Sequence, residues 1–246
     1  MPRVGSPRFT YRRFLHSSWG CPDPAGFRLC GMDEVGRGAF AGPLVAAAVV
    51  LPTGFRHRFL CDSKVLTAAQ REVADRAIRR RAEAVAVLEI DAEQINRRGI
   101  SWANVELFRR LVELIEADGY CCDGNLRVDA SRRVVSLVRG DSLVPAVSAA
   151  SIVAKVHRDA LMTALHDQAP HFNWASNKGY GAPEHRRALR AHGVHPQHRD
   201  LWVRHWLQLD LFGDDLAGDG DAALGADDDA PPTFVLAAAE QLLRPA

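Results

Sequence analysis

The sequence predicts an α/β fold, because short apolar segments typical of strands alternate along the chain with longer segments of helical periodicity. The chain has 246 residues, of which 47% are hydrophobic and 25% charged, which is enough apolar material to bury a sizeable core. No apolar run approaches the roughly 18–20 residues that a membrane helix needs, so no membrane partner is expected. We find no internal repeat.

The first predicted elements are two strands joined by a tight turn. Residues 27–32 form a short apolar run that ends in the acidic pair Asp33 and Glu34. Residues 44–51 are rich in valine and alanine without a helical period, a pattern typical of a strand buried on both faces. The glycine-rich segment 36–38 between the two runs predicts the turn.

The middle of the chain predicts two helices separated by a strand. Residues 67–84 have helical periodicity, with Thr67 as a plausible N-cap. The apolar face of this helix is expected to comprise Val73, Ala77 and Ile78. Residues 85–90 alternate as a short strand, Asp91 can cap the next turn, and residues 101–115 predict a second amphipathic helix.

The remaining elements are two short strands, a long helix and a C-terminal helical part. Residues 120–122 and 134–138 have the composition of strands, and residues 148–164 predict a long helix. Residues 170–204 are rich in histidine, arginine and glycine and contain interspersed helical pieces. The whole pattern predicts a sheet flanked by helices, followed by a smaller helical subdomain.

Charge is divided unevenly along the chain. The formal net charge is +1, but residues 210–246 contain nine acids and one base, which leaves about +9 on the first 209 residues and about −8 on the tail. A basic body suits the phosphate backbone of a nucleic acid. We therefore expect a poorly ordered basic extension at residues 1–26, the main domain at residues 27–212, and a disordered acidic tail at residues 213–246.

The cysteine pattern indicates a reducing compartment. The five cysteines form no C-x-x-C pair, which argues against a zinc ribbon, and their odd number argues against a disulfide framework. The expected location is the cytoplasm.

Four acidic residues stand where predicted strands stop: Asp33, Glu34, Asp123 and Asp141. Strand ends of an α/β sheet bring side chains from distant parts of the sequence together, and two unit charges 4 Å apart repel by about 4 kcal/mol at an effective dielectric of 20. Such a cluster needs protons or divalent cations, and oxygen ligands favour Mg²⁺ or Mn²⁺. Two such ions can support phosphodiester hydrolysis. The alternative is that each acid merely caps a turn.

Several motifs in a fixed order identify a family. They are GMDEVGRG (31–38), DSK (62–64), CDGN (122–125), GDS (140–142), SAASIVAK (148–155) and KGYG (178–181), followed by His185 and by His198 with Arg199. Together they span about residues 28–199 and resemble ribonuclease HII, a type 2 ribonuclease H. The resemblance implies an RNase H-like mixed sheet flanked by helices.

The resemblance also implies an activity. The family's four metal-binding and catalytic acids fall on Asp33, Glu34, Asp123 and Asp141. The implied enzyme is a metal-dependent endoribonuclease that uses two Mn²⁺ or Mg²⁺ ions. It hydrolyses the RNA strand of RNA–DNA hybrids and cuts on the 5′ side of ribonucleotides embedded in duplex DNA, leaving 3′-hydroxyl and 5′-phosphate ends. This chemistry serves ribonucleotide excision repair.

The resemblance assigns substrate contacts as well. The backbone of Gly36, Arg37 and Gly38 would contact the ribose 2′-hydroxyl, the group that distinguishes RNA from DNA, and Tyr180 would stack on the following deoxyribose. Arg37 favours ribonuclease HII over the related ribonuclease HIII, which has lysine in this turn and an additional N-terminal domain.

Three further basic residues are candidates for phosphate contacts. Lys64 could bind a phosphate near the metals, or be a solvated lysine beside a helix start. Lys155 and Arg158 lie three apart on one helix and could bind backbone phosphate, or could cover the exposed face of that helix.

A short peptide precedes the acidic tail. Its sequence, QLDLF at residues 208–212, resembles the peptide by which bacterial replication and repair proteins bind the sliding clamp. Its candidate contacts are Gln208, Leu209, Leu211 and Phe212, whose apolar side chains could fill a hydrophobic groove. The alternative is that Leu207, Leu211 and Phe212 form the apolar side of a closing helix.

Two other functions compete with the nuclease. A hybrid-binding module without catalysis would need no cluster of acids beside phosphate, and a DNA resolvase of the same fold would need no residues that contact a 2′-hydroxyl. We expect a monomeric enzyme.

Overall fold

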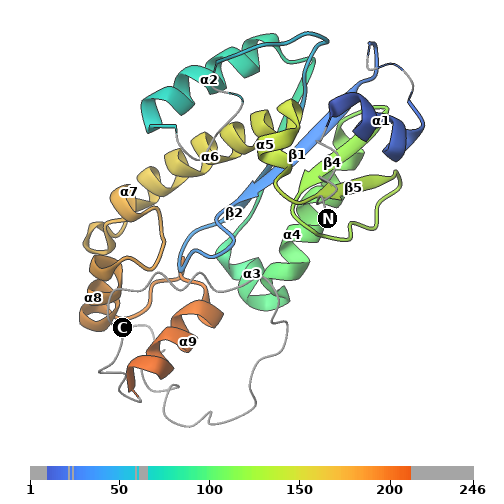
Figure 1. The fold of residues 1–246 in the computed structure, drawn as a ribbon. Helices are drawn as coiled ribbons and strands as arrows, with labels where there is room; N and C mark the ends of the chain where they lie inside the picture. The colour runs from blue at the N-terminus through green and yellow to red at the C-terminus, as the bar shows by residue number, and fades with distance from the viewer. Residues whose placement is uncertain (1–9, 22, 24, 59, 61–65, 212–246) are drawn as a thin grey trace, which may run out of the picture.

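The computed structural model describes residues 10–21, 23, 25–58, 60 and 66–211, the last four by their backbone alone. It has an α/β fold built on a five-stranded mixed sheet in the order β3-β2-β1-β4-β5 (Figure 1). The strands are β1 (Leu29–Val35), β2 (Leu44–Val50), β3 (Ala84–Ile90), β4 (Gly119–Asp123) and β5 (Val134–Leu137). The predicted fold class, a mixed sheet with flanking helices, is confirmed.

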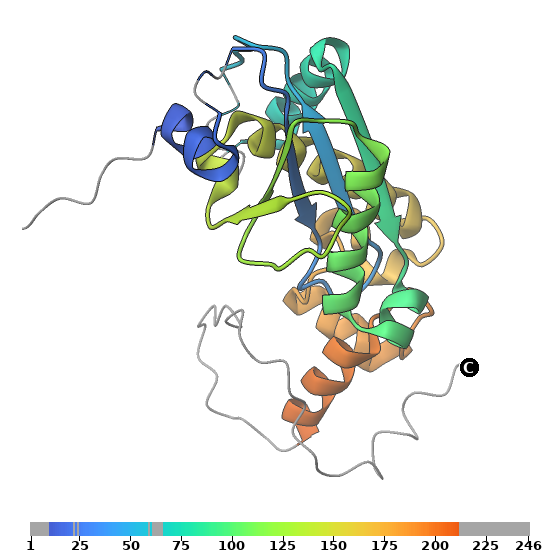
Figure 2. The same ribbon diagram turned by 90° about the vertical axis from the view of Figure 1, so that its right-hand side faces the viewer.

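Helices cover both faces of this sheet. The long helix α6 lies along one face with α2, and α4 covers the other (Figures 1 and 2). The helices are α1 (Tyr11–Trp19), α2 (Ala68–Arg81), α3 (Ala92–Arg98), α4 (Ile100–Leu114), α5 (Gly140–Leu143), α6 (Pro145–His166), the 3₁₀ helix η2 (Pro170–Phe172), α7 (Trp174–Asn177), α8 (Pro183–His192) and α9 (Asp200–Leu211). Within the described residues, no helix combines the length and the apolar character that a membrane crossing requires.

Strand β2 shows why the central sheet is stable. All seven of its residues are buried, as its continuous apolar sequence predicts. Alternate side chains point to opposite faces, so Leu44 and Ala46 pack with α4, whereas Val45 and Ala47 pack with α2 and α6. β2 pairs antiparallel with β1 from Cys30↔Val50 to Val35↔Val45, so the predicted pair of strands joined by a glycine turn is confirmed.

Helix α2 begins as predicted, but its buried face differs. The Thr67 hydroxyl accepts a hydrogen bond from the Gln70 N–H, and the Gln70 side chain accepts one from the Thr67 N–H, which forms a capping box. Ala74 and Ile78, four residues apart, are fully buried, whereas Val73 is 42% exposed. The prediction for Val73 is wrong because the buried face is centred on Ala74 and Ile78. Adjacent helical positions point about 100° apart, which turns Val73 toward the solvent.

The N-terminal segment is more ordered than its composition predicts. Residues 11–19 form α1, with the Thr10 hydroxyl accepting a hydrogen bond from the Arg13 N–H at its start. Phe14 and Leu15 are buried in a cluster that includes Leu29 of β1. The expectation of poor order is therefore wrong for this helix, because two large apolar side chains outweigh the surrounding arginines.

The C-terminal helices form a cluster of their own. η2, α7, α8 and α9 pack around the buried rings of Phe172 and Trp174, joined by Leu189, Val203 and Trp206. In both views this group lies at the opposite end of the molecule from α1 (Figures 1 and 2). The loop between β1 and β2 reaches this group, because Phe40 N–H donates to the Gly179 carbonyl at 2.8 Å. The helical part therefore contacts the loop that follows the acidic pair of β1.

Candidate active site

The parallel strands β1 and β4 bring two of the predicted acids together. Their register pairs Leu29 with Gly119 and continues to Met32 with Cys122. Asp33 and Asp123 are the next residues on each strand, so both lie at the same edge of the sheet. β5 is parallel to β4 and also ends at this edge. Strand pairing therefore provides the convergence that the sequence predicts.

Alternation along β1 points its two acids to opposite faces of the sheet. Met32 packs with α4, so Asp33 points toward α6, where it is 7% exposed and accepts a hydrogen bond from Ser151. Glu34 points toward α4, where the fully buried Asn104 faces it. Ser151 of α6 thus stabilises the ionised form of this acid.

Asp141 reaches this region from a helix. β5 ends at Leu137, and Asp141 lies in the first turn of α5, where it is 3% exposed. The expectation that Asp141 directly follows a strand is thus wrong, because a short turn and the start of α5 separate it from β5. The adjacent Gly140 N–H donates to the Asp123 carboxylate at 2.7 Å, which fixes the start of α5 against the end of β4. The four acids therefore come from β1, β4 and α5.

The acids affect one another electrostatically. Burial raises the pKa of Asp33 well above its ordinary value, the charges of Glu34 and Asp123 raise it further, and the Ser151 hydrogen bond opposes the rise. Burial also raises the pKa of Glu34, opposed by the Arg37 guanidinium and reinforced by the charge of Asp123. The fully charged cluster is therefore unfavourable without a compensating cation.

The chemistry of these side chains fits a divalent cation. All four acids offer oxygen ligands, which Mg²⁺ and Mn²⁺ prefer, and the raised pKa values of Asp33 and Glu34 mean that a nearby positive charge would favour their ionised forms. Among the described residues, no three His, Cys, Asp or Glu side chains lie close enough to hold one ion as they stand. Binding would therefore have to draw the carboxylates closer together.

The predicted substrate-contacting turn lies immediately after the acidic pair. Gly36 is buried, Arg37 is partly exposed and Gly38 is exposed. Gly36 has φ 91°, and a Cβ added there would lie 2.2 Å from the Arg158 Nε atom, so only glycine fits. A Cβ added to Gly38 would meet nothing within 4 Å. Gly36 therefore serves the fold, whereas Gly38 leaves an open surface.

Tyr180 is joined to the same turn. The N–H groups of Phe40 and Ala41 donate to the Gly179 carbonyl at 2.8 and 3.1 Å, which docks the tyrosine loop on the β1–β2 loop. The Tyr180 side chain is 37% exposed. The structure thus brings the turn and Tyr180 together, although they are distant in the sequence.

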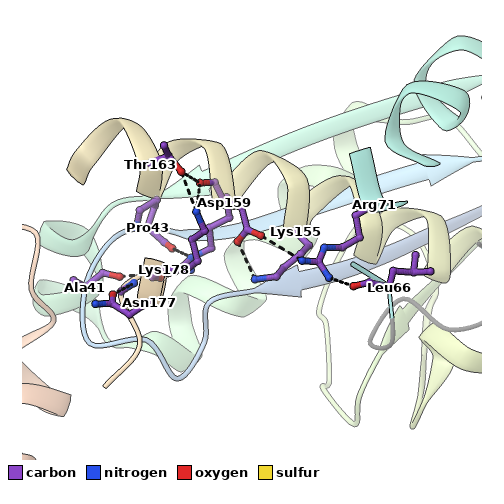
Figure 3. Close-up of polar contacts among 11 residues, drawn as sticks. Ala41, Pro43, Leu66, Arg71, Lys155, Asp159, Thr163, Asn177 and Lys178 are labelled. Carbon is purple, nitrogen blue, oxygen red and sulfur yellow. Dashed lines mark hydrogen bonds and ion pairs between the residues drawn. The ribbon is translucent and has the colours of Figure 1, made fainter. Parts of the chain in front are cut away.

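The predicted phosphate contacts have different outcomes. Lys64 lies outside the described residues. Lys155 is partly exposed and forms an ion pair with Asp159 at 2.8 Å, and Arg71 contacts the same carboxylate at 3.8 Å (Figure 3). Arg158 is fully buried and donates to backbone carbonyls, so the prediction that it binds phosphate is wrong.

Sequence reasoning gave no role to several polar residues that are buried near the turn. His185, His198 and Trp174 form a hydrogen-bonded group, in which the His185 and His198 Nε2 atoms are 3.0 Å apart. Arg199 is fully buried, and Asn104 is fully buried beside Glu34, where its side-chain amide opposes the rise in the pKa of Glu34. Only the motif positions of His185, His198 and Arg199 pointed to them, and Asn104 gave no signal.

The clamp-like peptide is only partly described. α9 extends to Leu211, so the backbone of residues 208–211 is helical. Leu207 packs at the edge of the C-terminal cluster, as the closing-helix alternative expects. Phe212 and the side chains of Gln208, Leu209 and Leu211 lie outside the described part.

Comparison with known proteins gives one consistent result. The family model described as ribonuclease HII matches residues 30–209. The ribonuclease HII of Ralstonia nicotianae is 44% identical over 176 residues, which cover 70% of this chain and 75% of that protein. The ribonuclease HII of Koribacter versatilis is 39% identical over 184 residues, covering 73% and 71%.

Solved structures agree in fold. The structure of the PCNA–RNase HII complex of Archaeoglobus fulgidus matches with a TM-score of 0.63 and 25% identity, covering 72% of this chain and 95% of that one. Ribonuclease H2 of Pyrococcus horikoshii matches with a TM-score of 0.64 and 24% identity, covering 74% and 98%. A complex of Bst-RNase HIII with Mn²⁺ matches with a TM-score of 0.61 and 22% identity, covering 84% and 76%. The last two matches support the fold alone.

Proposed function

The chain belongs to the ribonuclease HII family and is a nuclease of RNA–DNA hybrids, and we propose that it also cuts 5′ of single ribonucleotides in duplex DNA. The proposed products are a 3′-hydroxyl and a 5′-phosphate, formed with two divalent ions. The observation that carries the proposal is the placement of the acids of β1 and β4 beside a turn and a tyrosine suited to a ribose.

The acids are proposed to hold the cations. Asp33, Glu34, Asp123 and Asp141 supply only oxygen ligands, and burial of Asp33 and Asp141 limits competition from water. Bound divalent ions at such a site supply a nucleophilic water at neutral pH and stabilise charge on the leaving oxygen. Ser151 keeps the Asp33 carboxylate oriented through its hydrogen bond. No protein nucleophile is needed.

The turn and Tyr180 are proposed to select the substrate. Because Gly38 carries no Cβ and its surroundings are open, a sugar can approach the backbone of the turn closely. The 2′-hydroxyl is the group that distinguishes RNA from DNA at one position. Tyr180 presents an exposed ring next to this surface for the neighbouring deoxyribose.

The charge distribution favours a duplex substrate. The first 209 residues carry about +9, and the phosphate backbone dominates the affinity of most nucleic-acid-binding proteins. Of the three candidate phosphate contacts, Lys155 is the one that the structure describes as partly exposed, although it would have to leave Asp159 to serve.

Cleavage of one defined duplex tests this function. Duplex DNA with a single ribonucleotide, incubated with Mg²⁺ or Mn²⁺, is expected to be cut by the wild type and not by Asp123→Asn. Asp129→Asn changes an exposed acid of the loop after β4 and serves as the matched control, which should retain activity. Failure of the wild type to cut would overturn the proposal and leave the non-catalytic binding module. Equal cutting of a duplex without ribonucleotides would favour a DNA nuclease instead.

We also propose that residues 208–212 bind a sliding clamp. A ribonuclease HII of similar fold forms a complex with PCNA, which supports an interaction of this kind. Titration of the bacterial clamp with the wild type and with a Leu211→Ala, Phe212→Ala double variant tests it. The double variant is expected to lose affinity, whereas equal affinity would rule out this peptide.

A further inference from the structure

Two arginines lie beneath the turn without a carboxylate partner. Arg158 of α6 and Arg199, which immediately precedes α9, are both fully buried. Among the described residues, no acidic side chain lies within ion-pair distance of either guanidinium. Buried charges are normally paired, because their desolvation is costly. The arginine pair (Arg158 and Arg199) therefore needs another explanation.

Their hydrogen bonds go to the backbone of the β1–β2 loop. Arg199 donates from Nη1 to the carbonyls of Gly36 at 2.5 Å and Arg37 at 3.1 Å, and from Nε to Gly42 at 2.9 Å. Arg158 donates from Nε to the Pro43 carbonyl at 2.9 Å and from Nη2 to the Ala41 carbonyl at 3.1 Å. The acceptors Ala41 and Pro43 lie beside Lys178, whose carbonyl accepts from Arg158 Nη1 at 2.8 Å (Figure 3).

These bonds determine which way the turn presents its N–H groups. In a planar trans peptide the carbonyl and the following N–H point in opposite directions. Because the Gly36 and Arg37 carbonyls point at Arg199, the N–H groups of Arg37 and Gly38 point away from it. Within the described residues neither N–H has a backbone acceptor. Two free donors therefore face the exposed side of the turn.

The same segment also fixes the tyrosine loop. The Nδ1 atom of His198 accepts from the His195 N–H at 2.8 Å, which leaves the His198 Nε2–H to donate to His185. His185 Nε2 also accepts from the Trp174 indole at 3.1 Å, so His185 Nδ1–H donates to the Tyr180 carbonyl at 2.8 Å. With this tautomer assignment the Trp174 and His198 donors share the single Nε2 lone pair of His185. His198 and Arg199 thus connect Tyr180 to the turn.

The arrangement is costly to maintain. Burial, together with the nearby charge of Arg158, lowers the pKa of Arg199 to about 9, and the Arg199 Nη2 atom is buried without a described partner. Even a buried ion pair can often be replaced by apolar side chains with a neutral or stabilising effect, and these two guanidinium groups lack a carboxylate that would offset their desolvation. A purely stabilising role would therefore not require two guanidinium groups here.

We propose that Arg158 and Arg199 are positioning residues that make this nuclease selective for ribose, by holding the turn with its Arg37 and Gly38 N–H groups directed at the 2′-hydroxyl. The inference rests on the proposed function. The two guanidinium groups together bind five carbonyls of the β1–β2 loop and the Lys178 carbonyl of the loop that carries Tyr180. They therefore hold the turn and the tyrosine loop in a fixed position relative to each other. Because both side chains are fully buried, neither arginine is expected to touch the substrate.

The test compares binding to two duplexes that differ by one hydroxyl. Arg199→Lys keeps the positive charge but cannot bridge three carbonyls, because lysine lacks the planar fork of arginine. Affinities for a labelled duplex with one ribonucleotide and for the all-DNA duplex of the same sequence are measured with Ca²⁺ in place of Mg²⁺. The preference for the ribonucleotide is expected to fall about tenfold, the value of one to two hydrogen bonds. Mn²⁺ binding without duplex should be unchanged.

An arginine-to-lysine substitution away from the turn serves as the control for this test. Arg109→Lys removes one guanidinium whose hydrogen bonds, within the described residues, go to Glu106 on α4, and it should retain the full preference. If Arg199→Lys binds both duplexes more weakly by the same factor, or keeps the wild-type preference, the positioning role is refuted. A wild type without preference would refute the proposed function itself. If Arg199→Lys does not fold, Arg158→Lys is subjected to the same comparison with the same criteria.

Discussion

Substituting alanine for each of the two glycines of the turn should separate folding from substrate recognition. Gly36→Ala places a Cβ at φ 91° and 2.2 Å from Arg158 Nε. The left-handed backbone costs roughly 1–2 kcal/mol, and displacing Arg158 loses a charged hydrogen bond of about 1.5–3 kcal/mol. The expected loss in the free energy of unfolding is therefore about 3–5 kcal/mol.

Gly38→Ala should behave in the opposite way. Its Cβ meets nothing within 4 Å and its φ lies outside the left-handed region, so the folded state accepts alanine without strain. The free energy of unfolding should stay within about 1 kcal/mol of the wild type, because alanine also restricts the unfolded chain. The methyl group would nevertheless stand on the surface that we propose meets the ribose, so cleavage at a single ribonucleotide should fall.

Urea unfolding and cleavage of the single-ribonucleotide duplex measure the two effects separately. A stability difference of 3–5 kcal/mol corresponds to roughly 10 °C in the unfolding midpoint for a chain of this size. If Gly36→Ala unfolds within 1 kcal/mol of the wild type, the close contact with Arg158 does not exist as described. If Gly38→Ala cleaves as well as the wild type, the open face of the turn does not meet the sugar.

Three further predictions concern caps and acids. Thr67→Ala removes the capping box of α2 and should cost about 1 kcal/mol in urea unfolding, whereas Thr67→Ser should restore most of it. Burial and the charge of Glu34 raise the pKa of Asp33 in the folded protein well above 3.8, its value in the unfolded chain. As the pH rises above 3.8, Asp33 ionises more readily in the unfolded chain, so the free energy of unfolding falls. Asp33→Asn should therefore stabilise the protein in EDTA, increasingly so above that pH, and a constant difference across the pH range would contradict this. Hydrogen bonding to Arg109 lowers the pKa of Glu106 from 4.5 to about 2, so its contribution is present above pH 4.5 and lost as pH falls through 2. Glu106→Gln should be destabilising near pH 6 and neutral near pH 2 in thermal unfolding, and an unchanged curve would show that this ion pair adds no stability.

The acids and the strands that carry them could be predicted because their signals are local. A continuous apolar run predicted β2. Asp33 and Asp123 each directly follow an apolar run, and this position predicted where acidic side chains would converge. The cap at Thr67 follows from a hydroxyl and a glutamine three residues apart. Each of these features depends on neighbours within a few residues, so the sequence alone contained the necessary information.

The interior around the turn could not be predicted because its partners are distant. Two of the three carbonyls that accept from Arg158, those of Ala41 and Pro43, lie more than a hundred residues away, so spacing along α6 indicated only an exposed cation. Asn104 lies within an ordinary amphipathic helix, and only the fold shows that it faces Glu34. At the other end, Phe14 and Leu15 were visible in the sequence, but the surrounding arginines indicated a solvated segment.

The hydrogen bond from Arg199 to Gly36 spans 163 residues of the chain. During synthesis from the N-terminus, all four acids leave the ribosome before the guanidinium that holds the turn. A nascent chain can therefore gather its carboxylates early, but it cannot fix the turn until Arg199 has been added. Contacts of such long sequence separation are also slow to form, because a large loop must close first. The proposed ability to distinguish ribose from deoxyribose should thus be among the last properties that the folding chain acquires.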